Sequence, residues 1–267
     1  MPIRYILKIN SAFGGQNSAL VVKRYSRKNM NRKVVITGAS SEMGQAIIKK
    51  VAKADDQLIV QGYQNSENLR SLKSTYPHCE LLSLDFTKSE ELEEFCSYLD
   101  DVDIFINLSA VTVTDILPAI KESSIDTMLS VNIQALILIT QSLIPSMVAK
   151  RAGIIVNLSS IAASRGNRGQ SVYAGTKGFV ESFSRSVASE YGGKGVRINC
   201  VAPGPIDAGS LKPLYAQAPK ELLQSIVSPK IGSVEDVANM IAFLCGKESE
   251  FINGQVLHID GGFCKGV

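Results

Sequence analysis

From residue 33 onward the chain alternates between short apolar runs and longer stretches with apolar positions at helical spacing. The apolar runs have the length and continuity of buried strands and lie at 33–36, 57–60, 80–84, 103–107, 153–158, 195–201 and 255–259. Between them run amphipathic helical patterns that include 44–53, 124–150, 172–191 and 234–246. Buried strands joined through helices predict parallel pairing, with helices covering both faces of the sheet.

This alternation predicts an α/β fold, a single Rossmann-type doubly wound domain with a seven-stranded parallel sheet, because strand–helix–strand crossovers are almost always right-handed. The length of 267 residues suits one such domain, and 45% hydrophobic residues suffice for its core. The most apolar stretch, residues 133–144, is interrupted by polar side chains and falls short of the ~18 residues of a membrane span. We therefore expect a cytoplasmic protein with no membrane partner.

Charge divides the chain into two parts. Residues 1–30 contain six basic residues and no acidic one, whereas residues 31–267 carry a net charge of −3, which gives no support to nucleic-acid binding. We therefore separate an N-terminal extension, residues 1–29, from a main domain, residues 30–267. Five cysteines without CxxC spacing favour reduced thiols over a disulfide framework or a metal site, and no metal is expected.

A glycine-containing turn follows the first strand of the domain. Such a turn from a strand into a helix presents backbone N–H groups and the positive end of the helix to a pyrophosphate. The residues of this turn expected to contact a dinucleotide are Gly38, Ser40, Ser41, Met43 and Gly44. An ordinary strand-to-helix turn remains the alternative, since a lone glycine motif is weak evidence.

The end of the second strand indicates which dinucleotide is bound. Sites for NAD usually carry an acidic residue there, which binds the ribose 2′-hydroxyl group. Here the segment contains neutral Tyr63, Asn65 and Ser66, and no acid occurs before Glu67. Neutral donors can bind a 2′-phosphate that a carboxylate would repel, so NADP (as NADPH) is predicted.

A tyrosine and a lysine provide candidate catalytic chemistry. Tyr173 and Lys177 stand four residues apart in a helical stretch, so their side chains share one face. A nearby ammonium favours ionisation of a phenol, which could then exchange a proton near neutral pH. Ser160 adds a hydroxyl group just past the strand at 153–158, at the edge where open α/β sheets bind ligands. Without Ser160, a chance pair on a solvated helix face would be an equally good interpretation.

Taken together, these motifs resemble the short-chain dehydrogenase/reductase family along residues 31–267. The matching elements are Thr37-Gly38…Gly44, Asp85-Phe86, Asn107, Asn132, Ser160, Tyr173-x-x-x-Lys177, Asn199, Pro203-Gly204 and Ile252-Asn253-Gly254-Gln255. The resemblance implies a catalytic tetrad in which Tyr173 is the general acid and Ser160 orients the substrate carbonyl. Lys177 would bind the nicotinamide ribose, and Asn132 would hold a water molecule in the proton relay.

The resemblance also implies further contacts with the cofactor. Asp85, with Phe86 beside it, would lie near the adenine, and Asn107 would support the cofactor loop. The nicotinamide would be flanked by Pro203, Gly204 and Ile206. Three positions depart from the family pattern: Glu42 replaces the middle glycine of the turn, Asn107-Leu108-Ser109-Ala110 replaces Asn-Asn-Ala-Gly, and Ala208 replaces a threonine. A carboxylate at Glu42 is unfavourable near a pyrophosphate unless it points away or caps the helix.

Within the family the chain looks most like the 3-oxoacyl-acyl carrier protein reductases, which dock an acidic carrier protein through two basic residues. The matching positions are Arg151 and Lys194, so the resemblance implies reduction of a 3-oxoacyl thioester linked to acyl carrier protein, in fatty-acid or polyketide-like biosynthesis, by a homotetramer. A short-chain dehydrogenase for a sugar, steroid or quinone, and a non-catalytic dinucleotide-binding protein, are the alternatives. The acyl group cannot be predicted from these residues.

The extension resembles another class of protein. Residues 10–24 are similar to the C-terminal end of β-ketoacyl synthases, and Met30 stands where a reductase would begin. A synthase remnant or a misassigned start is the favoured interpretation of residues 1–29. A transit peptide, a disordered basic tail and a hairpin belonging to the fold remain open.

Overall fold

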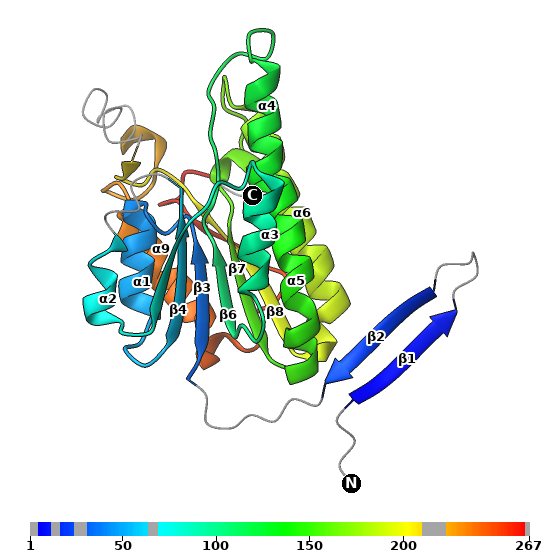
Figure 1. Ribbon diagram of the computed structural model, residues 1–267. Helices are drawn as coiled ribbons and strands as arrows, with labels where there is room; N and C mark the ends of the chain where they lie inside the picture. The colour runs from blue at the N-terminus through cyan, green and yellow to red at the C-terminus, as the bar shows by residue number, and fades with distance from the viewer. Residues whose placement is uncertain (1–4, 12–16, 24–30, 64–68, 210–222, 265–267) are drawn as a thin grey trace.

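The fold is known from a computed structural model that describes residues 5–11, 17–23, 31–63, 69–209 and 223–264. Its main feature is a seven-stranded sheet in the order β5-β4-β3-β6-β7-β8-β9, and every pairing in this sheet is parallel (Figure 1). The strands are β3 (Lys33–Thr37), β4 (Gln57–Gly62), β5 (Cys79–Ser83), β6 (Ile104–Asn107), β7 (Gly153–Leu158), β8 (Val196–Pro203) and β9 (Val256–Ile259). The predicted fold class is confirmed.

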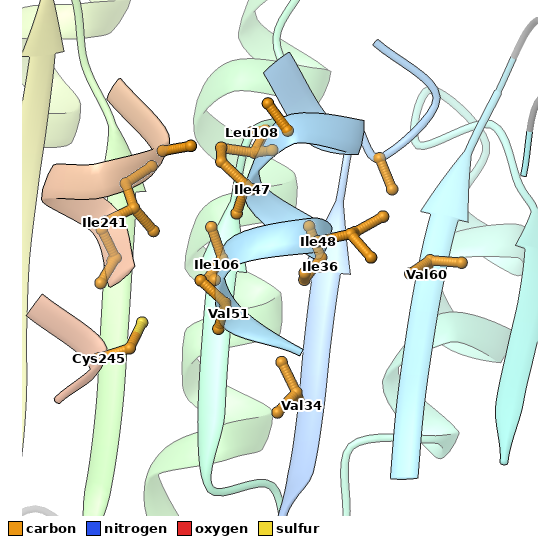
Figure 2. Packing of buried hydrophobic residues seen from close by; sticks show 14 of the residues in the cluster. Val34, Ile36, Ile47, Ile48, Val51, Val60, Ile106, Leu108, Ile241 and Cys245 are labelled. Carbon is orange, nitrogen blue, oxygen red and sulfur yellow. The ribbon is translucent and has the colours of Figure 1, made fainter. Parts of the chain in front are cut away.

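Helices cover both faces of the sheet. On one face α1 (Glu42–Val51) packs beside α9 (Val234–Cys245), and on the other lie α3 (Ser89–Ser97), α5 (Ala135–Lys150) and α6 (Ser171–Tyr191) (Figure 1). Alternate residues of β3 supply the two cores, because successive side chains of a strand point to opposite faces. Val34 and Ile36 join the core cluster on the α1–α9 side, which also contains Ile48 and Ile241 (Figure 2), and Val35 joins the other side.

The order of the strands places the candidate site. From β3 the chain proceeds outward to β4 and β5, then crosses back to β6 on the other side of β3. The register sets Thr37 beside Asn107 at the carboxyl ends of these two strands. In open α/β sheets a crevice opens at such a reversal, and ligands bind there.

The apolar pattern at 124–150 forms one long helical segment, Glu122–Lys150, as predicted. Within it, α4 (Glu122–Leu129) leads into a π-helical turn, Ser130–Gln134, before α5 begins. The π-helical turn was not predicted, because the apolar spacing runs through it unchanged. By length and composition this segment would pass for a membrane span, with a mean hydropathy of 1.5, but 44% of its most apolar window is buried inside the protein, as in many core helices.

Short helices and a hairpin are also among the described elements. The short helices that matter below are η3 (Ile161–Ala163) and η4 (Gly192–Lys194), while α2 (Leu72–Thr75) precedes β5 and η6 (Lys247–Ser249) follows α9. In the extension, β1 (Tyr5–Ser11) and β2 (Asn17–Lys23) pair antiparallel in a sheet of their own (Figure 1). The extension therefore adds no strand to the seven-stranded sheet.

Candidate cofactor and catalytic site

A cavity of about 570 Å³ opens at the reversal of the strand order. Six predicted cofactor contacts line it: Gly38, Ser40, Ser41, Tyr63, Asp85 and Phe86. The residues of its lining that were not predicted are Gln61, Leu84, Thr87, Leu108, Ser109, Ala110, Val111, Thr127 and Val131. The cavity thus extends from the glycine turn to the loop after β6 and the end of α4.

Two glycines allow the chain to turn tightly above β3. Gly38 has φ +64°, and a Cβ atom there would lie 2.8 Å from the backbone carbonyl carbon of Leu108. A Cβ atom on Gly44 would lie 2.6 Å from the backbone oxygen of Ala39. Ser41 caps α1, since its hydroxyl oxygen accepts a hydrogen bond from the Gly44 N–H group at 3.0 Å. The turn therefore requires glycine at both positions, and it directs the first turn of α1 at the cavity.

Gln61 connects the strand ends that surround the cavity. Its side chain is buried, donates to the Leu84 carbonyl at 2.7 Å, and accepts from the Gly38 N–H group and the Ser109 hydroxyl group, both at 3.2 Å. Beneath it, the Thr37 hydroxyl group donates to the Asn107 carboxamide at 2.8 Å. Asn107 therefore supports the loop from below and does not line the cavity. The only sequence signal for this network was a glutamine directly after the predicted buried strand at 57–60.

The departures from the family pattern leave the cavity open. Glu42 is exposed in the first turn of α1 and is not among the residues that line the cavity. Ser109 and Ala110, which replace the family's Ala-Gly, line the cavity with small side chains. Asp85 accepts hydrogen bonds from the Thr87 N–H and hydroxyl groups at 2.9 and 2.8 Å. These two bonds hold the carboxylate within the turn that follows β5.

Tyr173, Lys177 and Ser160 converge where α6 crosses the end of β7. The buried Lys177 ammonium donates to the Leu158 carbonyl at 2.7 Å and lies 5.8 Å from the centre of the Tyr173 ring. Ser160, two residues after Leu158, caps η3 by accepting from the Ala162 N–H group at 3.2 Å. The tyrosine and serine side chains remain partly exposed, as groups that meet a substrate must be.

Asn132 joins this cluster to the cavity. Its carboxamide accepts from the Val111 N–H group at 2.7 Å and donates to the Val111 carbonyl at 2.9 Å. The amide also donates to the Thr176 hydroxyl group at 3.0 Å, between Tyr173 and Lys177 on α6. Asn132 lies in the π-helical turn, a feature that is frequent at functional sites. Asn132 therefore connects Val111, which lines the cavity, to the helix that carries Tyr173 and Lys177.

A buried hydrogen bond that was not predicted holds the segment after β7, which carries Ser160, against α6. The Ser159 hydroxyl group donates to the Glu181 carboxylate at 2.7 Å, and both side chains are buried. Ser159 precedes Ser160, and Glu181 stands one helical turn after Lys177. The bond therefore couples the position of the serine to the helix that carries the tyrosine.

For this bond we expect Ser159→Ala to lower kcat about tenfold, because hydrogen bonds to charged groups contribute about 1.5–3 kcal/mol. Glu181→Gln should lose less, since it keeps an acceptor oxygen. Steady-state kinetics and NADPH titration measure the effect, and cofactor affinity should not change. Ser186→Ala, which removes an exposed hydroxyl group of the same helix, is the control. Unaltered kcat in Ser159→Ala would contradict the coupling.

The other predicted cofactor contacts lie outside the cavity lining. Pro203 ends β8, Gly204 packs against Asp260, and Ile206 is buried beside Gly232. Met43 lies within α1 and is half-buried. Asn65 and Ser66 fall outside the described residues. The contacts of these side chains with a nicotinamide or a 2′-phosphate therefore stay predictions.

Arg151 and Lys194 lie close together but far from Ser160. Arg151 donates to the Gly193 carbonyl at 3.4 Å, and the Lys194 ammonium lies 4.6 Å from the Tyr191 ring centre. Both residues precede the amino ends of strands, whereas Ser160 follows the carboxyl end of β7, roughly 20 Å away. α5 and α6 thus return to the opposite edge of the sheet from Ser160, and a role of Arg151 and Lys194 in docking a carrier protein stays a prediction.

The cysteines do not contribute to the site. Burial raises the pKa of Cys79 to about 11 and the pKa values of Cys200 and Cys245 to about 12, so these thiols stay protonated at neutral pH. Among the described residues, no group of three or more His, Cys, Asp or Glu side chains is arranged to hold a metal ion.

A doubly wound sheet with a glycine turn and a cavity at the strand reversal defines a dinucleotide-binding α/β protein. A family model described as enoyl-(acyl carrier protein) reductase matches residues 38–264. The 3-oxoacyl-[acyl-carrier-protein] reductase of Thermotoga maritima is 32% identical over 236 residues, which cover 85% of this chain and 96% of that protein. The corresponding enzyme of Rickettsia bellii is 30% identical over 229 residues, 85% and 95% of the two chains. The chain belongs to the short-chain dehydrogenase/reductase family of oxidoreductases.

Solved structures similar to this chain share its fold, but their descriptions name other substrates than those of the sequence relatives. A protein of Beutenbergia cavernae described as an NAD(P)-dependent gluconate 5-dehydrogenase with bound NADP has a TM-score of 0.81 and 25% identity, covering 88% of this chain and 97% of that one. A 2-deoxy-D-gluconate 3-dehydrogenase structure from Agrobacterium tumefaciens, also with bound NADP, has a TM-score of 0.79 and 26% identity at 88% and 97% coverage. The likeness of residues 1–29 to a β-ketoacyl synthase is not borne out, since the family match begins at residue 38.

Proposed function

We propose that this oxidoreductase reduces the ketone of a 3-oxoacyl thioester on acyl carrier protein to the 3-hydroxyacyl form, with NADPH as the reductant. The observation that carries the proposal is the convergence of Tyr173, Lys177 and Ser160 beside a cavity suited to a dinucleotide. The named relatives with 30% and 32% identity are 3-oxoacyl reductases and support this substrate class.

The chain's own residues supply orientation and a proton. The Ser160 hydroxyl group hydrogen-bonds to the substrate carbonyl and orients it. Tyr173 donates a proton to the carbonyl oxygen as negative charge develops there. The buried Lys177 ammonium stabilises the phenolate that remains, and its bond to Leu158 holds it in place. Asn132 positions the loop after β6 against α6, and its role in a water relay is part of the proposal.

The cavity fits NADPH by its shape and by the groups that line it. Gly38, Ser40 and Ser41 would hold the pyrophosphate at the first turn of α1, and Asp85 and Phe86 would border the adenine. When bound, NADPH supplies the hydride that reduces the carbonyl carbon. Tyr63 is 57% exposed at the rim, and no carboxylate stands at this position to repel a 2′-phosphate.

The preference for NADPH can be tested at Tyr63. We expect Tyr63→Asp to lower the ratio of kcat/KM for NADPH to that for NADH at least about tenfold, because like charges repel across the site. Tyr63→Asn, of equal size but neutral, is the matched control and should keep the ratio. Initial rates with each dinucleotide measure it. An equal ratio in both variants would contradict the placement of the 2′-phosphate.

The substrate assignment is tested with three compounds. The purified protein is offered acetoacetyl thioester with NADPH and with NADH, crotonyl thioester with NADPH, and gluconate with NADP. We expect oxidation of NADPH by the acetoacetyl thioester alone. Turnover of gluconate with no reduction of the acetoacetyl thioester would favour the second candidate, a sugar dehydrogenase, which the two gluconate dehydrogenase structures support.

The remaining predictions concern assembly and docking. We propose a cytoplasmic homotetramer in which the exposed apolar side chains Leu129, Ile137 and Leu138 are covered by another copy. We keep Arg151 and Lys194 as the surface that docks the acidic carrier protein, and residues 1–29 as an extension separate from the reductase domain. Size-exclusion chromatography with light scattering tests the tetramer, and Arg151→Glu with Lys194→Glu tests docking through the KM for acyl carrier protein.

A further inference from the structure

The loop between Ser160 and Tyr173 carries two arginines that the proposed chemistry does not use. Arg165 and Arg168 are both exposed, and residues 160–170 contain no acidic side chain. Over the part of the chain that the structure describes, neither guanidinium forms an ion pair with a carboxylate. Two unpaired cations beside the catalytic serine and tyrosine are notable in a domain whose net charge is negative.

Arg165 is held in place by the C-terminal segment. Its guanidinium lies 4.3 Å from the centre of the Phe263 ring and donates one hydrogen bond, at 3.5 Å, to the Phe263 carbonyl. Next to it, the Ser164 hydroxyl group lies 3.4 Å from the His258 imidazole. A guanidinium has five N–H donors, so most of those on Arg165 remain for a ligand. Stacking on an aromatic ring reduces the entropy that the side chain loses on binding.

Two carboxylates connected to this loop, Asp260 and Asp115, already have partners. Asp260 accepts from the Gly262 and Cys264 N–H groups at 2.9 and 2.8 Å. Asp115, whose N–H group bonds to the Gly169 carbonyl, accepts from the Ile116 N–H group at 2.8 Å. Both carboxylates therefore stabilise their own turns, and neither forms an ion pair with Arg165 or Arg168.

Apolar side chains stand next to each arginine. Ile116 and Leu117 follow the contact between Asp115 and Gly169 and are 46% and 65% exposed. On the other side, Val227 is 69% exposed and bonds through its N–H group to the Gly261 carbonyl, near Phe263. The rim above the catalytic residues thus combines apolar surface with two cations, which suits a ligand with both an apolar part and an anionic group.

We propose that Arg165 and Arg168 form an anion-binding element at the mouth of the active site, which takes a phosphate or carboxylate group of the substrate remote from its reacting carbonyl. Guanidinium groups bind such oxygen anions through paired hydrogen bonds. The phosphate of a pantetheine arm and the carboxylate of a sugar acid are the two sources of this chemistry. The inference rests on the proposed carbonyl reduction, and it specifies what the site recognises besides the ketone.

The test compares substrates with and without the charge. Acetoacetyl-N-acetylcysteamine is neutral, acetoacetyl-phosphopantetheine carries a phosphate, and 5-ketogluconate carries a carboxylate. In the variant with Arg165→Gln and Arg168→Gln, we expect kcat/KM to fall about tenfold for the anionic substrate that the wild-type protein reduces best, and less than twofold for the neutral thioester. The KM for NADPH should not change, and high salt should abolish the wild-type advantage of the anionic substrate.

Two controls keep the result specific. Arg185→Gln removes an exposed guanidinium on α6, twelve residues after Tyr173 and about 18 Å along the helix, and should change nothing. Arg168→Gln alone should show part of the loss without structural damage, since that side chain forms no hydrogen bond, ion pair or ring contact with a described residue. A loss of kcat/KM for only the phosphate-bearing substrate, or for only the carboxylate-bearing substrate, identifies which anion the two arginines bind. Either result supports the proposal.

Three outcomes would overturn the inference. Equal losses for neutral and anionic substrates, or no loss for either anion while the neutral thioester is still reduced, would overturn it and leave the proposed function standing. Failure of the wild-type protein to reduce any of the three probes would overturn the proposed function, and this inference with it.

Discussion

Replacement of Tyr173 by phenylalanine is expected to lower kcat about a thousandfold while NADPH binds as before. The substitution removes only the hydroxyl group, and general acid catalysis contributes about 10²- to 10⁴-fold to the rate. The ring, partly exposed near the start of α6, keeps its packing, and Lys177 keeps its bond to the Leu158 carbonyl. Single-turnover reduction of acetoacetyl thioester and fluorescence titration with NADPH measure the two quantities separately.

The control for Tyr173→Phe is another phenol of α6. Tyr191→Phe removes a hydroxyl group at the far end of the helix and should leave kcat unchanged. If Tyr173→Phe retained more than about a tenth of wild-type kcat, Tyr173 would not be the proton donor. Loss of NADPH binding together with activity would instead show that the phenol belongs to the cofactor site.

The second large effect is expected for Gly38→Ala. Alanine would have to adopt φ +64°, which costs about 1–2 kcal/mol, and its Cβ atom would lie 2.8 Å from the Leu108 carbonyl carbon. Because the Leu108 carbonyl carbon belongs to the backbone and cannot rotate away, the loops after β3 and β6 must separate. We expect a loss of at least about 2 kcal/mol in stability, a decrease in Tm of roughly 5 °C, and NADPH affinity at least tenfold weaker.

Calorimetry and NADPH titration measure these changes, with Gly193→Ala as the matched control. A Cβ atom on Gly193 meets no atom within 4 Å, and its φ is not positive, so that variant should behave as the wild type. Wild-type affinity in Gly38→Ala would mean that the dinucleotide does not depend on the close approach of the two loops.

The sheet was predictable because burial on both faces leaves continuous apolar runs in the sequence. The run at 153–158 matches β7 at both ends, and those at 33–36 and 57–60 end one and two residues early. The glycine turn and the pair Tyr173 and Lys177 were also recognisable, since each depends on local spacing along one element.

Features that depend on contacts between distant segments were not predictable. The π-helical turn at Asn132 is stabilised by bonds to Val111 and Thr176, which are 21 and 44 residues away. The Ser159–Glu181 bond and the Gln61 network likewise join separate elements. The position of Arg151 relative to Ser160 was not predictable either, because the family pattern gives their spacing without the direction in which α5 returns to the sheet.

The central claim is that this site adds hydride to a ketone rather than to a carbon–carbon double bond, and the position of a deuterium label tests it most directly. Acetoacetyl thioester is reduced with NADPH deuterated at the hydride-donating carbon, and the product is analysed by mass spectrometry and NMR. The account predicts one deuterium on C3 of the 3-hydroxyacyl product. Absence of labelled hydroxy product, with deuterium instead entering the saturated product of crotonyl thioester, would contradict it.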